Sequence, residues 1–185
     1  MSKLNILALA SAALIPTTAL ADWNGWYMGG GISAASNLSY DITANIDPDV
    51  DFEDTNGFGA FFGMHRAFPS FVLGYEVALE IPSDAEEFGG DATIDYLLDL
   101  KLTGGVPAGD ALVYGIVSLS GIYGSYGPND INATGIGLGA GAAFKLNDNV
   151  SISAEYIARS ATQEFDVTDV DATADTLALR AAYHF

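Results

Sequence analysis

Residues 71–81 read Phe-Val-Leu-Gly-Tyr-Glu-Val-Ala-Leu-Glu-Ile, and a large apolar side chain occupies every second position of this stretch. The intervening positions hold smaller side chains or the carboxylates of Glu76 and Glu80. Because successive side chains of a strand point to opposite faces, this period of two predicts a β-strand and not a helix. One face of the predicted strand is apolar, and the other face carries charge.

The same alternation recurs along the rest of the chain, so the sequence predicts eight strands in total. The seven further stretches are 26–34, 57–65, 93–103, 112–123, 135–145, 150–156 and 176–185. In the second of these, as in residues 71–81, every second residue is apolar and glycines recur between them. Small residues on one face suit a narrow enclosed space, which points to a barrel.

Two of these stretches carry an inside–outside assignment that the structure can test. In residues 93–103 the alternation places Ile94 on the apolar face and Asp95 on the opposite face. In residues 112–123 either face could point outward, and we prefer the assignment that turns Ser118 inward.

The connections between the predicted strands alternate in length. Residues 66–70, 106–110 and 146–149 form short connections, whereas residues 40–56, 82–92, 124–134 and 161–174 form long ones. Short turns at one end and long loops at the other are typical of outer-membrane barrels, and an even number of antiparallel strands can close without an edge. We therefore expect an all-β fold, an eight-stranded antiparallel up-and-down transmembrane β-barrel with a largely filled polar lumen.

The competing fold is a soluble eight-stranded barrel whose apolar face points inward to a ligand. In that fold the opposite face would have to coat a water-exposed surface, but this face is rich in glycine, as at Gly29, Gly63, Gly74 and Gly137. Aromatic residues near the strand ends, such as Trp26, also suit the girdles of a membrane barrel. The membrane barrel is therefore the favoured fold.

The N-terminal residues resemble a secretory signal. Lys3 precedes a mostly apolar run over residues 4–15, and Ala19-Leu20-Ala21 has the small-x-small form of a cleavage site. We expect residues 1–21 to be a signal peptide and residues 22–185 to be one outer-membrane β-barrel domain. The chain has 6 Lys and Arg against 24 Asp and Glu, and its net charge of -18 excludes nucleic-acid binding. It has no cysteine, which excludes disulfides and thiolate-bound metals.

Several segments resemble the small eight-stranded outer-membrane barrels of Gram-negative bacteria, which include the outer membrane protein A barrel and the opacity-type porin-like proteins. These segments are 26–31 (Trp-Tyr-Met-Gly-Gly-Gly), 61–63 (Phe-Phe-Gly), 73–76 (Leu-Gly-Tyr-Glu), 155–156 (Glu-Tyr) and 177–185 (Leu-Ala-Leu-Arg-Ala-Ala-Tyr-His-Phe). The resemblance covers nearly all of residues 22–185. It implies that Tyr183 and the terminal Phe185 form the signal that the barrel-assembly machinery recognises.

Charged residues on the inward face are the first candidate site. Counted from the short-turn end, Glu76 and Lys101 lie at similar depths on neighbouring strands, and so do Glu155 and Arg180. We expect two lumen ion pairs, because charges buried in a narrow barrel must be paired. A second set of inward charges is expected nearer the loop end and is interpreted as solvated at the mouth: Glu80, Asp95, Asp99 and Arg159.

The family resemblance adds that Glu76 and Lys101 match positions of the interior charge network of the outer membrane protein A barrel. Ile116 stands where the same resemblance leads us to expect an arginine.

Acidic residues in the long connections are the second candidate site. Asp47, Asp49 and Asp51 alternate in the first of these connections, and carboxylate oxygens are ligands that Ca²⁺ prefers. The spacing does not fit an EF-hand, because Phe52 stands where the turn requires glycine. A solvated acidic surface is the favoured interpretation. No tightly bound cofactor is expected, and a loosely bound Ca²⁺ or Mg²⁺ is left open.

These features predict a non-enzymatic protein of the bacterial outer membrane. The long loops are expected to be extracellular, and both mature ends are expected in the periplasm. The function is expected to be structural or cell-surface interaction, with a narrow porin-like channel as the alternative. The expected partners are outer-membrane lipid, lipopolysaccharide and the barrel-assembly machinery, and an unidentified surface ligand is left open. Catalysis is not expected, because His65 and His184 are both predicted to lie inward near the short-turn end.

Overall fold

The computed structural model describes residues 22–42, 50–51, 55–83, 92–126, 128–165 and 168–185. Its strands are β1 (Gly25–Ile42), β2 (Val50–Asp51), β3 (Thr55–Ala67), β4 (Val72–Pro82), β5 (Ala92–Ala108), β6 (Ala111–Tyr126), β7 (Asn129–Lys145), β8 (Val150–Phe165) and β9 (Thr168–His184). The signal peptide predicted for residues 1–21 lies outside the described residues. These residues contain no helix that is long and apolar enough to cross a membrane.

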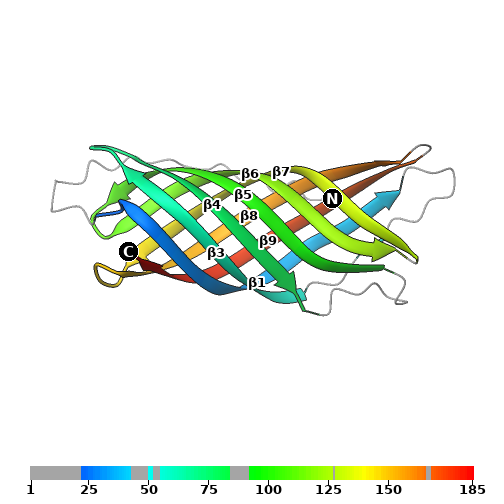
Figure 1. Cartoon of the computed structure of the whole chain (residues 1–185), viewed down its shortest axis with the longest axis horizontal. Helices are drawn as coiled ribbons and strands as arrows, with labels where there is room; N and C mark the ends of the chain where they lie inside the picture. Colours follow the sequence, from blue (N-terminus) through cyan, green and yellow to red (C-terminus); the bar gives the residue numbers. More distant parts are fainter. Residues whose placement is uncertain (1–21, 43–49, 52–54, 84–91, 127, 166–167) are drawn as a thin grey trace, which may run out of the picture.

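The strands form a closed antiparallel barrel (Figure 1). Each strand from β3 to β9 pairs with its neighbour in sequence, β3 pairs with β1, and β1 closes the barrel by pairing with β9. The two-residue β2 pairs only with Ser39 and Tyr40 of β1, so the barrel wall itself has eight strands. The predicted fold class, an eight-stranded antiparallel up-and-down transmembrane β-barrel, is confirmed.

The two ends of the barrel differ. At one end, which we call the turn end, short connections link β3 to β4, β5 to β6 and β7 to β8, and β9 also ends there. Gly109 lies in the β5–β6 turn with a φ of 64°, a left-handed conformation that glycine adopts without steric cost. We call the opposite end the loop end.

The inside–outside alternation follows the prediction along most of the barrel. Exposed apolar side chains such as Ile32, Leu102, Leu138 and Leu179 cover the outer surface. Ser118 and Ser120 are buried in the lumen, so the preferred assignment for residues 112–123 is confirmed. An apolar exterior and a partly polar interior are what a bilayer requires.

The assignment of Ile94 and Asp95 is wrong. The pairing of β5 with β6 shifts register between Ile94 and Tyr96, which leaves Asp95 as an additional residue in β5. A bulge of this kind reverses the faces of the residues beyond it. Ile94 is consequently buried in the lumen, and Asp95 is exposed.

The long connections are also shorter than predicted. Strand pairing continues to Tyr126 in β6 and resumes at Asn129 in β7, and it continues to Phe165 in β8 and resumes at Thr168 in β9. A strand needs only about 9–11 residues to span a bilayer, whereas β1 has 18 residues and β9 has 17. Backbone pairing therefore continues beyond the apolar belt, and these strands project from the membrane at the loop end.

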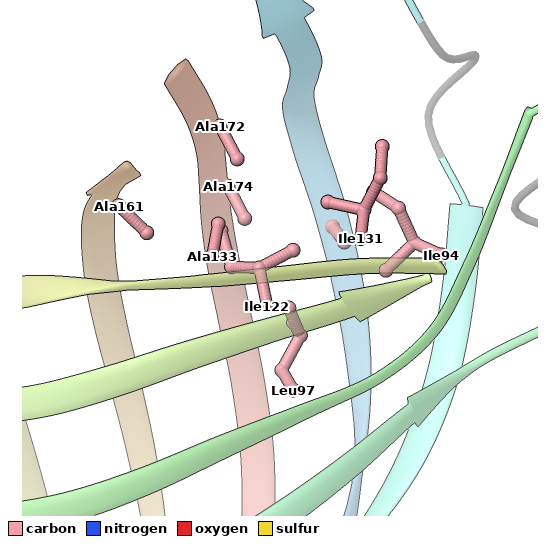
Figure 2. Close-up of a cluster of buried hydrophobic side chains, with 9 residues drawn as sticks. Ile94, Leu97, Ile122, Ile131, Ala133, Ala161, Ala172 and Ala174 are labelled. Atoms are coloured by element: carbon pink, nitrogen blue, oxygen red, sulfur yellow. The ribbon is translucent and has the colours of Figure 1, made fainter. Parts of the chain in front are cut away.

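The lumen of this projecting part is apolar, in contrast to the polar lumen that the sequence predicted. Figure 2 shows large side chains inside the barrel, close to alanines from neighbouring and facing strands. We call this set the apolar cluster, and its members are Ala35, Ile94, Leu97, Ile122, Ile131, Ala133, Ala161, Ala172 and Ala174. Strands that rise above the membrane form their own core here, which is why the inward face changes from charged to apolar residues.

The lumen charge network and its place in the outer membrane barrel family

The central feature of the lumen is a set of four charged side chains from two opposite walls. Glu76 lies on β4 and Lys101 on β5, and their backbones are paired in register. Glu155 on β8 and Arg180 on β9 come from the opposite side of the barrel. Each of the four residues is buried. We call this set the four-residue ring.

Each cation of the four-residue ring contacts both carboxylates. Nζ of Lys101 lies 3.2 Å from Oε1 of Glu76 and 2.8 Å from Oε2 of Glu155. Nη2 of Arg180 lies 2.6 Å from Oε2 of Glu76, and Nη1 forms an ion pair with Glu155. The two predicted ion pairs, Glu76–Lys101 and Glu155–Arg180, are therefore present, but they merge into one ring that crosses the lumen.

Aromatic side chains complete the four-residue ring. The Tyr27 hydroxyl donates to Oε2 of Glu76 at 3.1 Å, and the Tyr114 hydroxyl donates to Oε1 of Glu155 at 2.7 Å. The guanidinium of Arg180 lies 3.5 Å from the centre of the Phe61 ring, which is a cation–π contact. The sequence predicted no role for these aromatic residues in the network.

A second cluster lies nearer the loop end and is centred on Arg159. Nη2 of Arg159 lies 2.6 Å from Oδ2 of Asp99, and Nε donates to both oxygens of the same carboxylate. Nη1 donates to the Thr176 hydroxyl, and the Ser120 hydroxyl donates to Asp99 at 2.5 Å. Nη2 also lies 3.5 Å from Oε2 of Glu80. We call these five residues the Arg159 cluster.

The interpretation of these charges as solvated residues at the mouth is wrong. Arg159 is 4% exposed and Asp99 is 2% exposed, because the strands extend well beyond them and the apolar cluster lies on their loop-end side. Buried charges of this kind need partners, and the bidentate contact supplies them. Asp95, which was assigned to the same group, lies on the outer surface instead.

The turn end of the lumen is closed by the residues before β1. The backbone of Gly25 has a φ of 123°, and the preceding Trp23 is buried in the lumen with only 1% of its surface exposed. Its indole makes edge contacts with His65 and His184, with ring centres 6.2 and 5.9 Å apart. Nζ of Lys145 lies 5.4 Å from the centre of the indole.

We call Trp23, His65, His184 and Lys145 the Trp23 plug. Both histidines point inward near the turn end, as predicted. Trp23 was not predicted to lie in the lumen, because it precedes the first alternating stretch.

Two small cavities flank the four-residue ring. A cavity of about 30 Å³ lies between the ring and the Trp23 plug, and one of about 40 Å³ lies between the ring and the Arg159 cluster. Each is large enough for a few water molecules only.

The two other predicted sites are the terminal aromatic residues and the acidic residues of the first long connection. The rings of Tyr183 and Phe185 lie on the outer surface with centres 5.4 Å apart, and the backbone N–H of Phe185 donates to the carbonyl of Trp26. Asp47 and Asp49 lie outside the described residues, and Asp51 is described only as a backbone partner of Ser39. Within the described ranges, no three His, Asp or Glu side chains are grouped as a metal site would need.

Several solved structures share this fold. The attachment invasion locus protein Ail of Yersinia pestis is 17% identical, with a TM-score of 0.50, 88% of this chain covered and 99% of that one. Neisserial surface protein A is 15% identical, with a TM-score of 0.53 and coverages of 87% and 97%. The outer membrane protein OprG of Pseudomonas aeruginosa is 12% identical, with a TM-score of 0.53 and coverages of 88% and 96%. No curated protein matches the chain.

The sequence itself also matches a family. The model of the outer membrane protein beta-barrel domain matches residues 6–185, which is nearly the whole chain. This family resides in the bacterial outer membrane, in agreement with the apolar exterior of the barrel and the resemblance noted in its sequence. The chain belongs to the outer membrane protein beta-barrel domain family.

Proposed function

We propose that this protein is a sealed outer-membrane barrel whose role is structural and cell-surface interaction, and that it is neither a channel nor an enzyme. The observation that supports this function is the layering of the lumen. From the turn end to the loop end, the lumen contains the Trp23 plug, the four-residue ring, the Arg159 cluster and the apolar cluster. Conduction requires a continuous hydrated path, and an eight-stranded barrel is narrow enough for side chains to fill.

The proposed orientation places the loop end outside the cell and the turn end in the periplasm. Outer-membrane barrels have short periplasmic turns and longer extracellular segments, and the projecting strands lie at the loop end. The outward side chains there include the exposed carboxylates of Asp95, Asp130 and Asp171. In this orientation Tyr183 and Phe185 reach the periplasmic boundary, where the barrel-assembly machinery would bind them.

We propose that the mature protein begins at Asp22. The side chain of Trp23 enters the lumen directly after this residue, and the Asp22 carbonyl accepts a hydrogen bond from Nζ of Lys145 at 2.5 Å. Asp22 is exposed at the turn end, and Ala19-Leu20-Ala21 before it has the small-x-small form of a cleavage site. The mass of the protein purified from outer membranes tests this proposal, and a mature chain that retains Ala21 would contradict it.

The proposed surface partner is lipopolysaccharide, bridged by Ca²⁺ or Mg²⁺. Lipopolysaccharide phosphates and the outward carboxylates at the loop end are both negative, and hard divalent cations bind such oxygen ligands. The acidic residues of the long connections, Asp47, Asp49 and Asp51 among them, would add to the same surface.

Replacing Asp95, Asp130 and Asp171 together with asparagine is expected to remove most of the Mg²⁺-dependent stabilisation of the barrel in lipopolysaccharide bilayers. The readout is the temperature at which the folded band is lost in a gel, with and without Mg²⁺. The matched control replaces Asp110 and Asp148, which are exposed at the turn end, and should leave the Mg²⁺ effect unchanged. An equal loss in both variants would contradict the proposed orientation, and no loss in either would contradict the cation bridge.

A narrow channel is the alternative function. The two cavities beside the four-residue ring favour it, because they place space for water on both sides of a charged constriction. This alternative requires ion flux through the folded barrel and a change in that flux when Glu76 is replaced with glutamine.

A further inference from the structure

The charges of the four-residue ring and the Arg159 cluster, taken together, do not balance. The four-residue ring is neutral, because Glu76 and Glu155 face Lys101 and Arg180. The Arg159 cluster contains one cation and two carboxylates, Asp99 and Glu80. Together these two clusters carry one uncompensated negative charge, which is costly in a buried site. The remaining cation of the described lumen, Lys145, lies on the far side of the four-residue ring at the turn end, where it donates to the Asp22 carbonyl.

The left-over charge lies on Glu80. Arg159 makes its short contacts with Asp99, and its contact with Glu80 is longer at 3.5 Å and involves only Oε2. The other oxygen of Glu80, Oε1, is buried and has no hydrogen-bond partner among the described residues. The side chain of Glu80 is 13% exposed, so bulk water does not solvate it fully.

A second polar group near Glu80 also lacks a partner. Oγ of Ser33 on β1 is buried and accepts or donates no hydrogen bond within the described part of the chain. Ser33 is only 8% exposed. Buried hydroxyl and carboxylate oxygens are almost always hydrogen-bonded or bound to an ion or water, so these two oxygens together form a polar site suited to such a ligand.

Ser33 and Glu80 line the same cavity, the one of about 40 Å³ between the four-residue ring and the Arg159 cluster. Its volume accommodates about three water-sized particles. The charged groups that face it come from β4, β5, β8 and β9 and are Glu80, Asp99, Lys101, Glu155, Arg159 and Arg180. Each of these groups except Glu80 lies within 2.8 Å of an oppositely charged atom.

We propose that this cavity is a binding site for an alkali-metal ion such as Na⁺, held by Oε1 of Glu80 and Oγ of Ser33. Hard cations bind oxygen ligands, and one positive charge balances the four-residue ring and the Arg159 cluster. A divalent ion would leave an excess positive charge. The volume leaves room for water to complete the coordination of an alkali-metal ion.

The test compares the thermal stability of the detergent-purified barrel in NaCl and in N-methyl-D-glucamine chloride of equal ionic strength. The latter cation is too large for a cavity of this volume. Because a ligand that binds only the folded state stabilises it, NaCl is expected to raise the unfolding midpoint by about 3–6 °C.

Two variants show whether the effect belongs to this cavity. Glu80→Gln removes the uncompensated charge, and Ala78→Val fills the cavity from β4. Both are expected to reduce the Na⁺ effect to less than about 1 °C. The matched control is Ala182→Val, which faces the cavity on the other side of the four-residue ring and should retain the full effect.

The proposal is overturned if the unfolding midpoint of wild type is the same in NaCl and in N-methyl-D-glucamine chloride, or if Glu80→Gln retains the full response. If Ala78→Val does not fold, the Na⁺ response of Glu80→Gln, compared with that of wild type, still shows whether Glu80 holds the ion. The result of this test is separate from the proposal of a sealed lumen, because a conducting barrel could also hold an ion in this cavity.

Discussion

Replacing Arg180 with methionine is expected to lower the free energy of unfolding of the barrel by about 3–5 kcal/mol, because removing one partner from a buried ion-pair network leaves unpaired charge. Arg180 contacts both carboxylates of the four-residue ring and lies on the face of Phe61. The substitution leaves Glu76 and Glu155 with Lys101 as their remaining cation in the ring. Urea titration of the refolded barrel, followed by far-UV circular dichroism, measures the loss.

Two further variants separate the loss of this network from a general effect of removing arginine. Arg66→Met removes an exposed arginine near the turn end and should change stability by less than about 0.5 kcal/mol. The double variant Arg180→Met with Glu155→Gln should recover part of the loss, because Glu76 and Lys101 then balance each other. An Arg180→Met barrel as stable as the Arg66→Met barrel would contradict the structural role of the ring.

Replacing Trp23 with alanine is expected to cost about 3–5 kcal/mol, the usual range for truncating a buried tryptophan. Trp23 fills the turn end of the lumen and belongs to one group of buried hydrophobic side chains with Val72, Leu112 and Ile116. Its removal would leave a cavity that the rigid strand wall cannot close. The same urea titration measures the effect.

Trp26 provides the matched control for this prediction. It lies three residues further along the chain, but its side chain is 43% exposed on the outer surface and stacks on Phe62. Detergent or lipid fills the space that Trp26→Ala leaves, so its cost is expected to be less than half of that for Trp23→Ala. An equal or greater cost for Trp26→Ala would show that Trp23 does not plug the lumen.

The sequence predicted those features of the barrel that follow from local periodicity. Alternation assigned Glu76, Lys101, Glu155 and Arg180 to the lumen, and counting from the turns placed each pair at a common depth. The inward assignment and the common depth depend only on the pleat of a strand and on antiparallel register.

The features that the sequence did not predict depend on contacts across the lumen or on irregular backbone. Whether Arg180 reaches Glu76 depends on the barrel diameter, which no single strand encodes. The bulge at Asp95 reverses the predicted face of Ile94, and alternation alone carries no sign of it. Strands above the membrane lack an apolar outer face, so residues 124–134 and 161–174 resembled loops although most of them are paired strand.

The most direct test of the sealed lumen is single-channel recording of the detergent-refolded protein in a planar bilayer, with folding verified by the heat-dependent gel shift. Wild type is expected to give a silent membrane, because four layers of side chains interrupt the lumen. Steady openings in wild type, altered in conductance by Glu76→Gln, would contradict this account and assign the protein a channel function centred on the four-residue ring.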